Sequence, residues 1–89
     1  MDIPQKFIEA GYADMGNTYV GHRYTKGAFS VYHSGHLLIF LREGGLARSF
    51  PVDRLEHFSV ADMERQTVMI LRRFDMKEEV TNYDYYRKN

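Results

Sequence analysis

The feature that most constrains the fold is a set of three short connections that contain glycine: Lys26-Gly27, Ser34-Gly35 and Gly44-Gly45. Each connection separates segments that are rich in β-branched and aromatic residues. In a tight antiparallel hairpin, glycine accepts the positive φ that the turn requires. The spacing of the connections therefore predicts a meander of four strands, at about 18–25, 28–33, 36–43 and 46–52.

Two-residue loops also fix which residues face each other across each turn. This counting pairs Tyr24 with Phe29, His33 with His36, and Leu41 with Arg48. One face of the sheet then carries Val20, His22, Tyr24, Phe29, Val31, His33, His36, Leu38, Phe40 and Ala47. The other face carries Tyr19, Arg23, Tyr32, Leu37, Ile39, Leu41, Arg48 and Phe50. Both faces are largely apolar, so we expect each to be covered by flanking segments, by curling into a partial barrel, or by a second subunit.

The flanking segments complete an α+β domain that spans residues 1–89. Pro4 suits the first position of a short helix over 4–11, and the segment 12–17 has the composition of a loop. After the meander we expect, in order, a helical turn at 54–58, a second helical start at 60–65 from Ser59 and Asp62, a fifth strand at 66–74, a helix or turn at 76–80, and an extended or frayed tail.

The composition excludes several classes of protein. The chain of 89 residues has 12 Lys and Arg against 12 Asp and Glu, and it has no cysteine. Disulfides, cysteine-ligated metals and a thiol nucleophile are therefore excluded, and zero net charge argues against a general nucleic-acid coat. The longest apolar run, Leu37–Leu41, is far shorter than the roughly 18–20 residues that span a bilayer. The first residues also lack the pattern of a signal peptide, so we expect a cytoplasmic protein without a membrane contact.

Three histidines lie near one end of the predicted sheet and form the only candidate metal site: His22, His33 and His36. Imidazoles on adjacent strands are close enough to chelate a divalent ion. Histidines beside turns are more often exposed polar residues, however, and no familiar zinc spacing with a carboxylate is present. We therefore predict no metal and no cofactor, and keep a metal-dependent enzyme built on these residues as a third hypothesis.

No catalytic motif is visible in the sequence. Gly44-Gly45 is not followed by a phosphate-binding pattern, and none of the serines lies in a Gly-x-Ser-x-Gly context. We therefore predict that the chain has no catalytic residues and is not an enzyme.

The first hypothesis for function is a small non-catalytic binding protein. Tyrosine and arginine are the residues that most often anchor protein interfaces. They recur in the C-terminal segment and on one predicted sheet face, which makes the candidate partner-binding residues Tyr83, Tyr85, Tyr86, Arg87, Arg23 and Tyr32. An adaptor, or a compact inhibitor of the kind encoded by phages or mobile elements, fits this pattern. A homodimer would account for two apolar sheet faces on a short chain.

The alternative is a β-rich domain that binds nucleic acid or a nucleotide. No acidic residue occurs between Asp14 and Glu43, although basic and aromatic residues do. Arginine and aromatic side chains on a sheet neutralise phosphates and stack on bases. The candidate residues for such an anionic ligand are Tyr19, Arg23, Lys26, Arg42 and Arg48.

Overall fold

The computed structural model describes residues 2–69, so the expectations for residues 70–89 lie outside the described part of the chain. The described elements are, in order, α1 (Ile3–Glu9), β1 (Ala13–Asn17), β2 (His22–Lys26), β3 (Phe29–Ser34), β4 (Leu37–Arg42), β5 (Leu46–Pro51), the 3₁₀ helix η1 (Val52–Glu56) and a further helix over 60–69.

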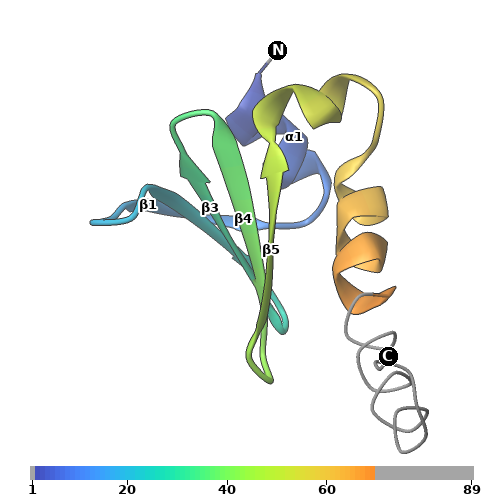
Figure 1. The fold of residues 1–89 in the computed structure, drawn as a ribbon. Helices are drawn as coiled ribbons and strands as arrows, with labels where there is room; N and C mark the ends of the chain where they lie inside the picture. Colours follow the sequence, from blue (N-terminus) through green and yellow to red (C-terminus); the bar gives the residue numbers. More distant parts are fainter. Residues whose placement is uncertain (1, 70–89) are drawn as a thin grey trace, which may run out of the picture.

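The five strands form one antiparallel sheet in the order β1-β2-β3-β4-β5, so each strand pairs with its neighbours in the chain. The sheet is open and does not close into a barrel. Figure 1 shows α1 and the helix over 60–69 on the same side of the sheet, while the end of the β1–β2 hairpin projects toward the other side. The predicted α+β class and the antiparallel meander are confirmed.

The N-terminal helix forms where the sequence predicts it. Asp2 is its N-cap, and the Asp2 carboxylate accepts a hydrogen bond of 3.1 Å from the Gln5 backbone N–H. Pro4 lies in the first turn, where its missing N–H costs no hydrogen bond. Gly11 follows the helix with a φ of 96°, a conformation that favours glycine.

The prediction of a loop over 12–17 is wrong, because Ala13–Asn17 is the edge strand β1. Four of its five residues are exposed, so burial imposes no alternating apolar pattern on this strand. A β-bulge between Asp14 and Gly16 bends it, and bulges at sheet edges discourage pairing with other chains. The predicted first strand over 18–25 is correspondingly too long, since the strand starts at His22 and residues 18–21 form the turn.

The pairing of the strands differs from the predicted register in a regular way. The first two hairpins turn at residues 27–28 and 35–36, one position later than expected, so His22 pairs with His33, Tyr24 with Val31, and His33 with Leu38. This displaces every partner by two positions. Because side chains alternate with a period of two, the assignment of β2, β3 and β4 residues to the two faces is unchanged.

The third hairpin reverses the predicted faces of β5. Its loop has three residues, since Arg42 pairs with Leu46, so Phe40 pairs with Arg48 and Leu38 with Phe50. A register that differs by one residue turns every side chain of a strand to the opposite face. Phe50 and Arg48 therefore lie on the helix-covered face, contrary to the prediction, and Ala47 lies on the other.

The prediction of a fifth strand over 66–74 is also wrong in its described part, because residues 66–69 continue the helix. Ser59 and Asp62 cap this helix reciprocally, with Ser59 N–H to Asp62 at 2.9 Å and Asp62 N–H to Ser59 Oγ at 3.1 Å. Val60, Met63 and Thr67 are buried at helical spacing. Capping and burial outweigh the strand propensity of the segment.

The hydrophobic core lies between the helices and one face of the sheet. Phe7 from α1 stacks on Tyr24 of β2 with 4.8 Å between the ring centroids. Phe40 and Phe50 meet edge to face at 5.4 Å. The buried residues are Ile3, Phe7, Tyr12, Tyr24, Val31, Leu38, Phe40, Phe50, Leu55, Val60, Met63 and Thr67. In the described part of the chain no helix is long and apolar enough to cross a membrane.

Candidate functional site

The sheet face opposite the helices carries no covering element within residues 2–69. We call it the open face, and the register of β2 to β5 assigns to it Arg23, Thr25, Ser30, Tyr32, Ser34, Leu37, Ile39, Leu41, Ala47, Ser49 and Pro51. One row of neighbours crosses four strands: Arg23 pairs with Tyr32, Tyr32 with Ile39, and Ile39 with Ser49. Within residues 2–69 the helices therefore cover one of the two faces, and a cover for the other face stays a prediction.

Arg23 is the only charged member of the open face. Its guanidinium carbon lies 5.8 Å from the centroid of the Tyr32 ring, a cation–π contact across two strands. The side chain is half-buried, and its Nε–H is buried without a hydrogen-bond acceptor among the described residues. None of the ion pairs formed within residues 2–69 involves Arg23. A partly desolvated cation without a counter-ion is unfavourable by itself, and it attracts an external acceptor.

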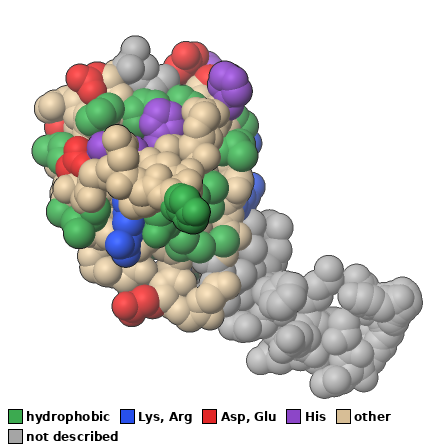
Figure 2. All heavy atoms as spheres, turned by 90° about the vertical axis from the view of Figure 1, so that its left-hand side faces the viewer, with side chains coloured by type: hydrophobic (Ala, Val, Ile, Leu, Met, Phe, Trp, Pro, Cys, Tyr) green, Lys and Arg blue, Asp and Glu red, His purple; other side chains and the backbone are tan. Residues whose placement is uncertain are grey.

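The centre of the open face is apolar. Tyr32, Ile39 and Leu41 are half-buried, and Leu37 is 43% exposed. Figure 2 views the molecule from the side toward which the β1–β2 hairpin projects, and it shows hydrophobic side chains spread across this side with acidic groups toward the outline. The side chains are smaller on β5, the edge strand, where Ala47 pairs with Leu41 and Ser49 pairs with Ile39. This is a surface on which another macromolecule can bury apolar area.

The other basic candidates lie on the helix-covered face. Lys26 contacts the Glu64 carboxylate at 2.9 Å and donates a hydrogen bond to the Ala10 carbonyl at 3.1 Å. Arg42 lies over the Phe29 ring at 5.6 Å, and Arg48 over the Phe50 ring at 5.0 Å. The structure therefore separates Arg23 from the three other basic residues of the predicted anionic-ligand site.

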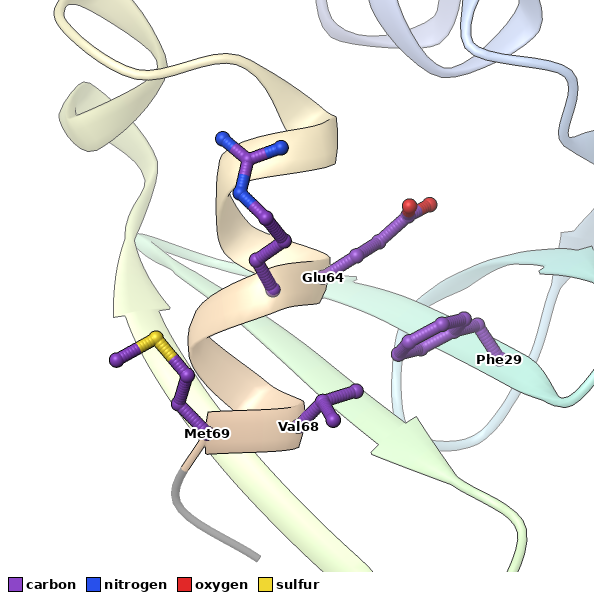
Figure 3. Close-up of a pocket in the computed structure, with 5 residues that line it drawn as sticks. Phe29, Glu64, Val68 and Met69 are labelled. Carbon is purple, nitrogen blue, oxygen red and sulfur yellow. The ribbon is translucent and has the colours of Figure 1, made fainter. Parts of the chain in front are cut away.

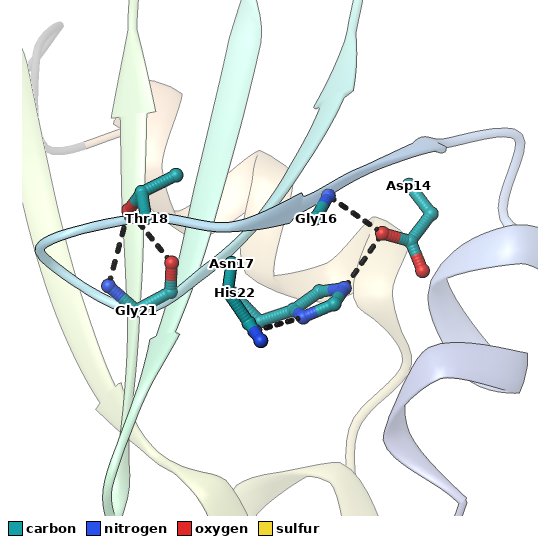
Figure 4. Close-up of polar contacts among 6 residues, drawn as sticks. All are labelled: Asp14, Gly16, Asn17, Thr18, Gly21 and His22. Atoms are coloured by element: carbon teal, nitrogen blue, oxygen red, sulfur yellow. Dashed lines mark hydrogen bonds and ion pairs between the residues drawn. The ribbon is translucent and has the colours of Figure 1, made fainter.

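His22 is held by two side chains of β1. Its Nε2 lies 2.6 Å from Asp14 Oδ1, and its Nδ1 lies 2.7 Å from Asn17 Oδ1 (Figure 4). The Gly16 backbone N–H also donates to Asp14, at 2.9 Å. This backbone hydrogen bond and the contact with His22 lower the pKa of Asp14. The cluster fastens β1 to β2 beside the bulge.

The histidines do not form a metal site in the described part of the chain. His22 and His33 are cross-strand partners, but both nitrogens of His22 are engaged by β1, and His33 Nε2 contacts the Gly35 carbonyl at 3.1 Å. His36 lies exposed in the β3–β4 turn. Among residues 2–69, no group of three or more histidine and acidic side chains is placed to hold a metal ion.

A hollow of about 480 Å³ lies beside the helix over 60–69, lined by Phe29, Glu64, Arg65, Val68 and Met69 (Figure 3). The Glu64 carboxylate accepts a hydrogen bond of 2.6 Å from the Tyr12 hydroxyl in addition to the Lys26 contact. Burial and this carboxylate raise the pKa of Tyr12. Arg65 pairs with Asp62. Both charged residues of the hollow are thus engaged, and its remaining wall is apolar.

The structure brings together only part of the predicted partner-binding set. Arg23 and Tyr32 are in contact on the open face, whereas Tyr83, Tyr85, Tyr86 and Arg87 lie outside the described residues. Tyr19 lies on the β1–β2 turn rather than on a strand. The sequence alone did not single out Ile39 and Leu41 as binding residues, because an apolar residue on a predicted strand is expected in the core as much as on an exposed face.

Comparison of the chain with protein-family models, with curated proteins and with solved structures finds no match in any of the three.

Proposed function

We propose that this protein is a non-catalytic binding protein, and that its open face docks a protein partner. The observation that carries the proposal is a sheet face that combines an apolar centre with one half-buried cation, Arg23, which forms no ion pair within residues 2–69. Apolar area supplies the free energy of association, and a single charge fixes the orientation of the partner. An adaptor or a compact inhibitor that acts in the cytoplasm, of the kind encoded by phages or mobile elements, is the role that we favour.

The charge of the open face favours a different protein over a second copy of this chain. The face offers Arg23 and no carboxylate, so two copies placed face to face would bring two cations together without a counter-ion. A partner that places an acidic side chain over Arg23 satisfies the guanidinium and covers Tyr32 and Ile39 at the same time.

A binding experiment with one substitution on each side of the sheet tests the proposal. The tagged full chain, Ile39→Asp and Ile8→Asp would each be used to recover proteins from a lysate of the native cells. Ile8 is 45% exposed on α1, so Ile8→Asp controls for the added charge. We expect the wild type and Ile8→Asp to recover the same protein in stoichiometric amount, and Ile39→Asp to lose it while its circular dichroism is unchanged.

Two results would contradict the proposal. Recovery of the same proteins by a folded Ile39→Asp variant would place any interface elsewhere. A dimer in light scattering that Ile39→Asp dissociates would assign the open face to a second copy of the chain. Once a partner has been identified, we expect Arg23→Met to weaken the affinity for it on the order of tenfold and to make that affinity less dependent on salt concentration. Arg23→Lys should keep much of the affinity.

A further inference from the structure

Exposed hydrophobic side chains concentrate at one short segment of the described chain. Among the side chains of residues 2–69 whose exposure the structure describes, seven large hydrophobic ones are exposed, and three of them, Met15, Tyr19 and Val20, lie within six positions of each other. The Tyr19 side chain has a relative exposure of 105%, so it packs against no other part of the described protein. Scattered exposed hydrophobics need no explanation, but a cluster with a fully exposed aromatic ring marks an interaction site.

The turn that carries Tyr19 is closed by a network of hydrogen bonds. The Thr18 hydroxyl donates to the Gly21 carbonyl at 2.7 Å and accepts a hydrogen bond from the Gly21 N–H at 3.2 Å (Figure 4). It also accepts a hydrogen bond from the Val20 N–H at 3.1 Å. The Thr18 N–H also donates to the Gly21 carbonyl, at 2.8 Å. Below the turn, the contacts of His22 with Asp14 and Asn17 hold the two strands together. Tyr19 is therefore presented on an ordered support, and binding would order little additional backbone.

We infer that Tyr19 is an anchor residue, which inserts into an apolar pocket on the protein partner that covers the open face. This inference rests on the proposed function and adds a second contact to it. The hairpin end projects toward the side of the sheet that the helices leave uncovered (Figure 1). A partner on the open face therefore meets the hairpin end as well. A tyrosine ring that enters a pocket buries about 150–250 Å², which is enough to dominate a small interface.

The charge around the turn favours a protein over a nucleic acid as the occupant. Residues 13–22 contain no Lys or Arg, and their one acidic residue is Asp14. A strand of nucleic acid that stacked a base on Tyr19 would find in this hairpin one basic residue outside the described ion pairs, Arg23, and a single cation would leave most of its phosphates unneutralised. A protein pocket lined by apolar side chains, with a polar group that meets the tyrosine hydroxyl, has no such cost.

Photocrosslinking from single positions tests this inference separately from the proposed function. The full chain would carry p-benzoylphenylalanine in place of Tyr19, of Tyr32 on the open face, or of Ile8 on α1 as the control. Each variant would be irradiated in a lysate of the native cells. We expect positions 19 and 32 to crosslink to the same protein and position 8 not to do so. Mass spectrometry should place the crosslink from position 19 in a concave apolar site of that protein.

The other outcomes refute the inference in distinguishable ways. Crosslinks from position 32 alone would leave the proposed function standing and exclude Tyr19 from the interface. Crosslinks from neither position would overturn both proposals, and a crosslink from position 19 to nucleic acid would overturn the inference.

Affinity for the captured protein supplies a second measurement. We expect Tyr19→Ala to weaken binding by about 30-fold or more, and Tyr19→Phe to weaken it by much less. The melting temperature of Tyr19→Ala should equal that of the wild type, since the side chain makes no contact in the described protein. Equal affinity of Tyr19→Ala and the wild type would refute the anchor role.

Discussion

Leu37 and Leu38 provide a direct test of which sheet face is the core. They are identical neighbours on β4 with opposite surroundings, since Leu38 is fully buried and Leu37 is 43% exposed. Truncation of a buried leucine removes its transfer free energy and leaves a cavity, so Leu38→Ala should lower the free energy of unfolding by about 2–5 kcal/mol. Full burial of a leucine is worth about 1.5–3 kcal/mol, and Leu37 is roughly half removed from water, so Leu37→Ala should cost about 1 kcal/mol.

Urea unfolding followed by circular dichroism measures both values. If Leu38→Ala does not fold, the milder pair applies, and Leu38→Val should still cost about 1 kcal/mol more than Leu37→Val. Equal costs at the two positions would refute the assignment, because they would mean that both faces are covered. A cost at Leu37 that grows with protein concentration would identify that cover as a second copy.

Three further predictions concern the polar contacts. Glu64→Leu removes the acceptor of Tyr12 and Lys26 and should cost about 1–3 kcal/mol of unfolding free energy, whereas the exposed Glu56→Leu should change it little; equal values would show that the cluster is not stabilising. Ser59→Ala removes a helix cap and should cost about 1 kcal/mol in urea unfolding, against almost nothing for the exposed Ser49→Ala. The pKa of Asp14 is lower in the folded than in the unfolded state, so its contribution is present above about pH 4 and is lost as the pH falls through the folded-state pKa. Between pH 5 and pH 2, the urea midpoint of the wild type should therefore fall more than the urea midpoint of Asp14→Asn. Parallel plots of midpoint against pH for the two proteins would exclude this role of Asp14.

The fold was largely predictable because glycine turns and apolar composition are local signals. They placed β3, β4 and β5 in the chain, started β2 four residues too early, and assigned Arg23 and Tyr32 to a common face. The faces of β5 were not predictable, because a loop of two residues and a loop of three residues share the same Gly44-Gly45 sequence. β1 was not predicted, because an exposed edge strand is held by backbone hydrogen bonds and does not need the apolar or β-branched residues by which a strand is recognised in a sequence.

The candidate site was predictable only in part, for a related reason. A sequence pattern distinguishes the two faces of a strand, but it does not tell which face the helices cover. Ile39 and Phe40 look equivalent in the sequence, and only the packing of Phe7 against Tyr24 and Phe40 decides that Ile39 is left outside the core. The exposure of Tyr19 depends likewise on the Thr18 turn, which the prediction treated as strand.

The neighbour-to-neighbour order of the sheet has a consequence for how the chain folds. Each hairpin closes a short loop, so the sheet can assemble from local contacts at a low cost in chain entropy. The hydrogen bond from Tyr12 to Glu64 instead joins residues 52 positions apart. We therefore expect the helix over 60–69 to dock after the transition state has formed the central hairpins. Substitutions at Glu64 should then accelerate unfolding with little effect on the folding rate, whereas Leu38→Val should slow folding.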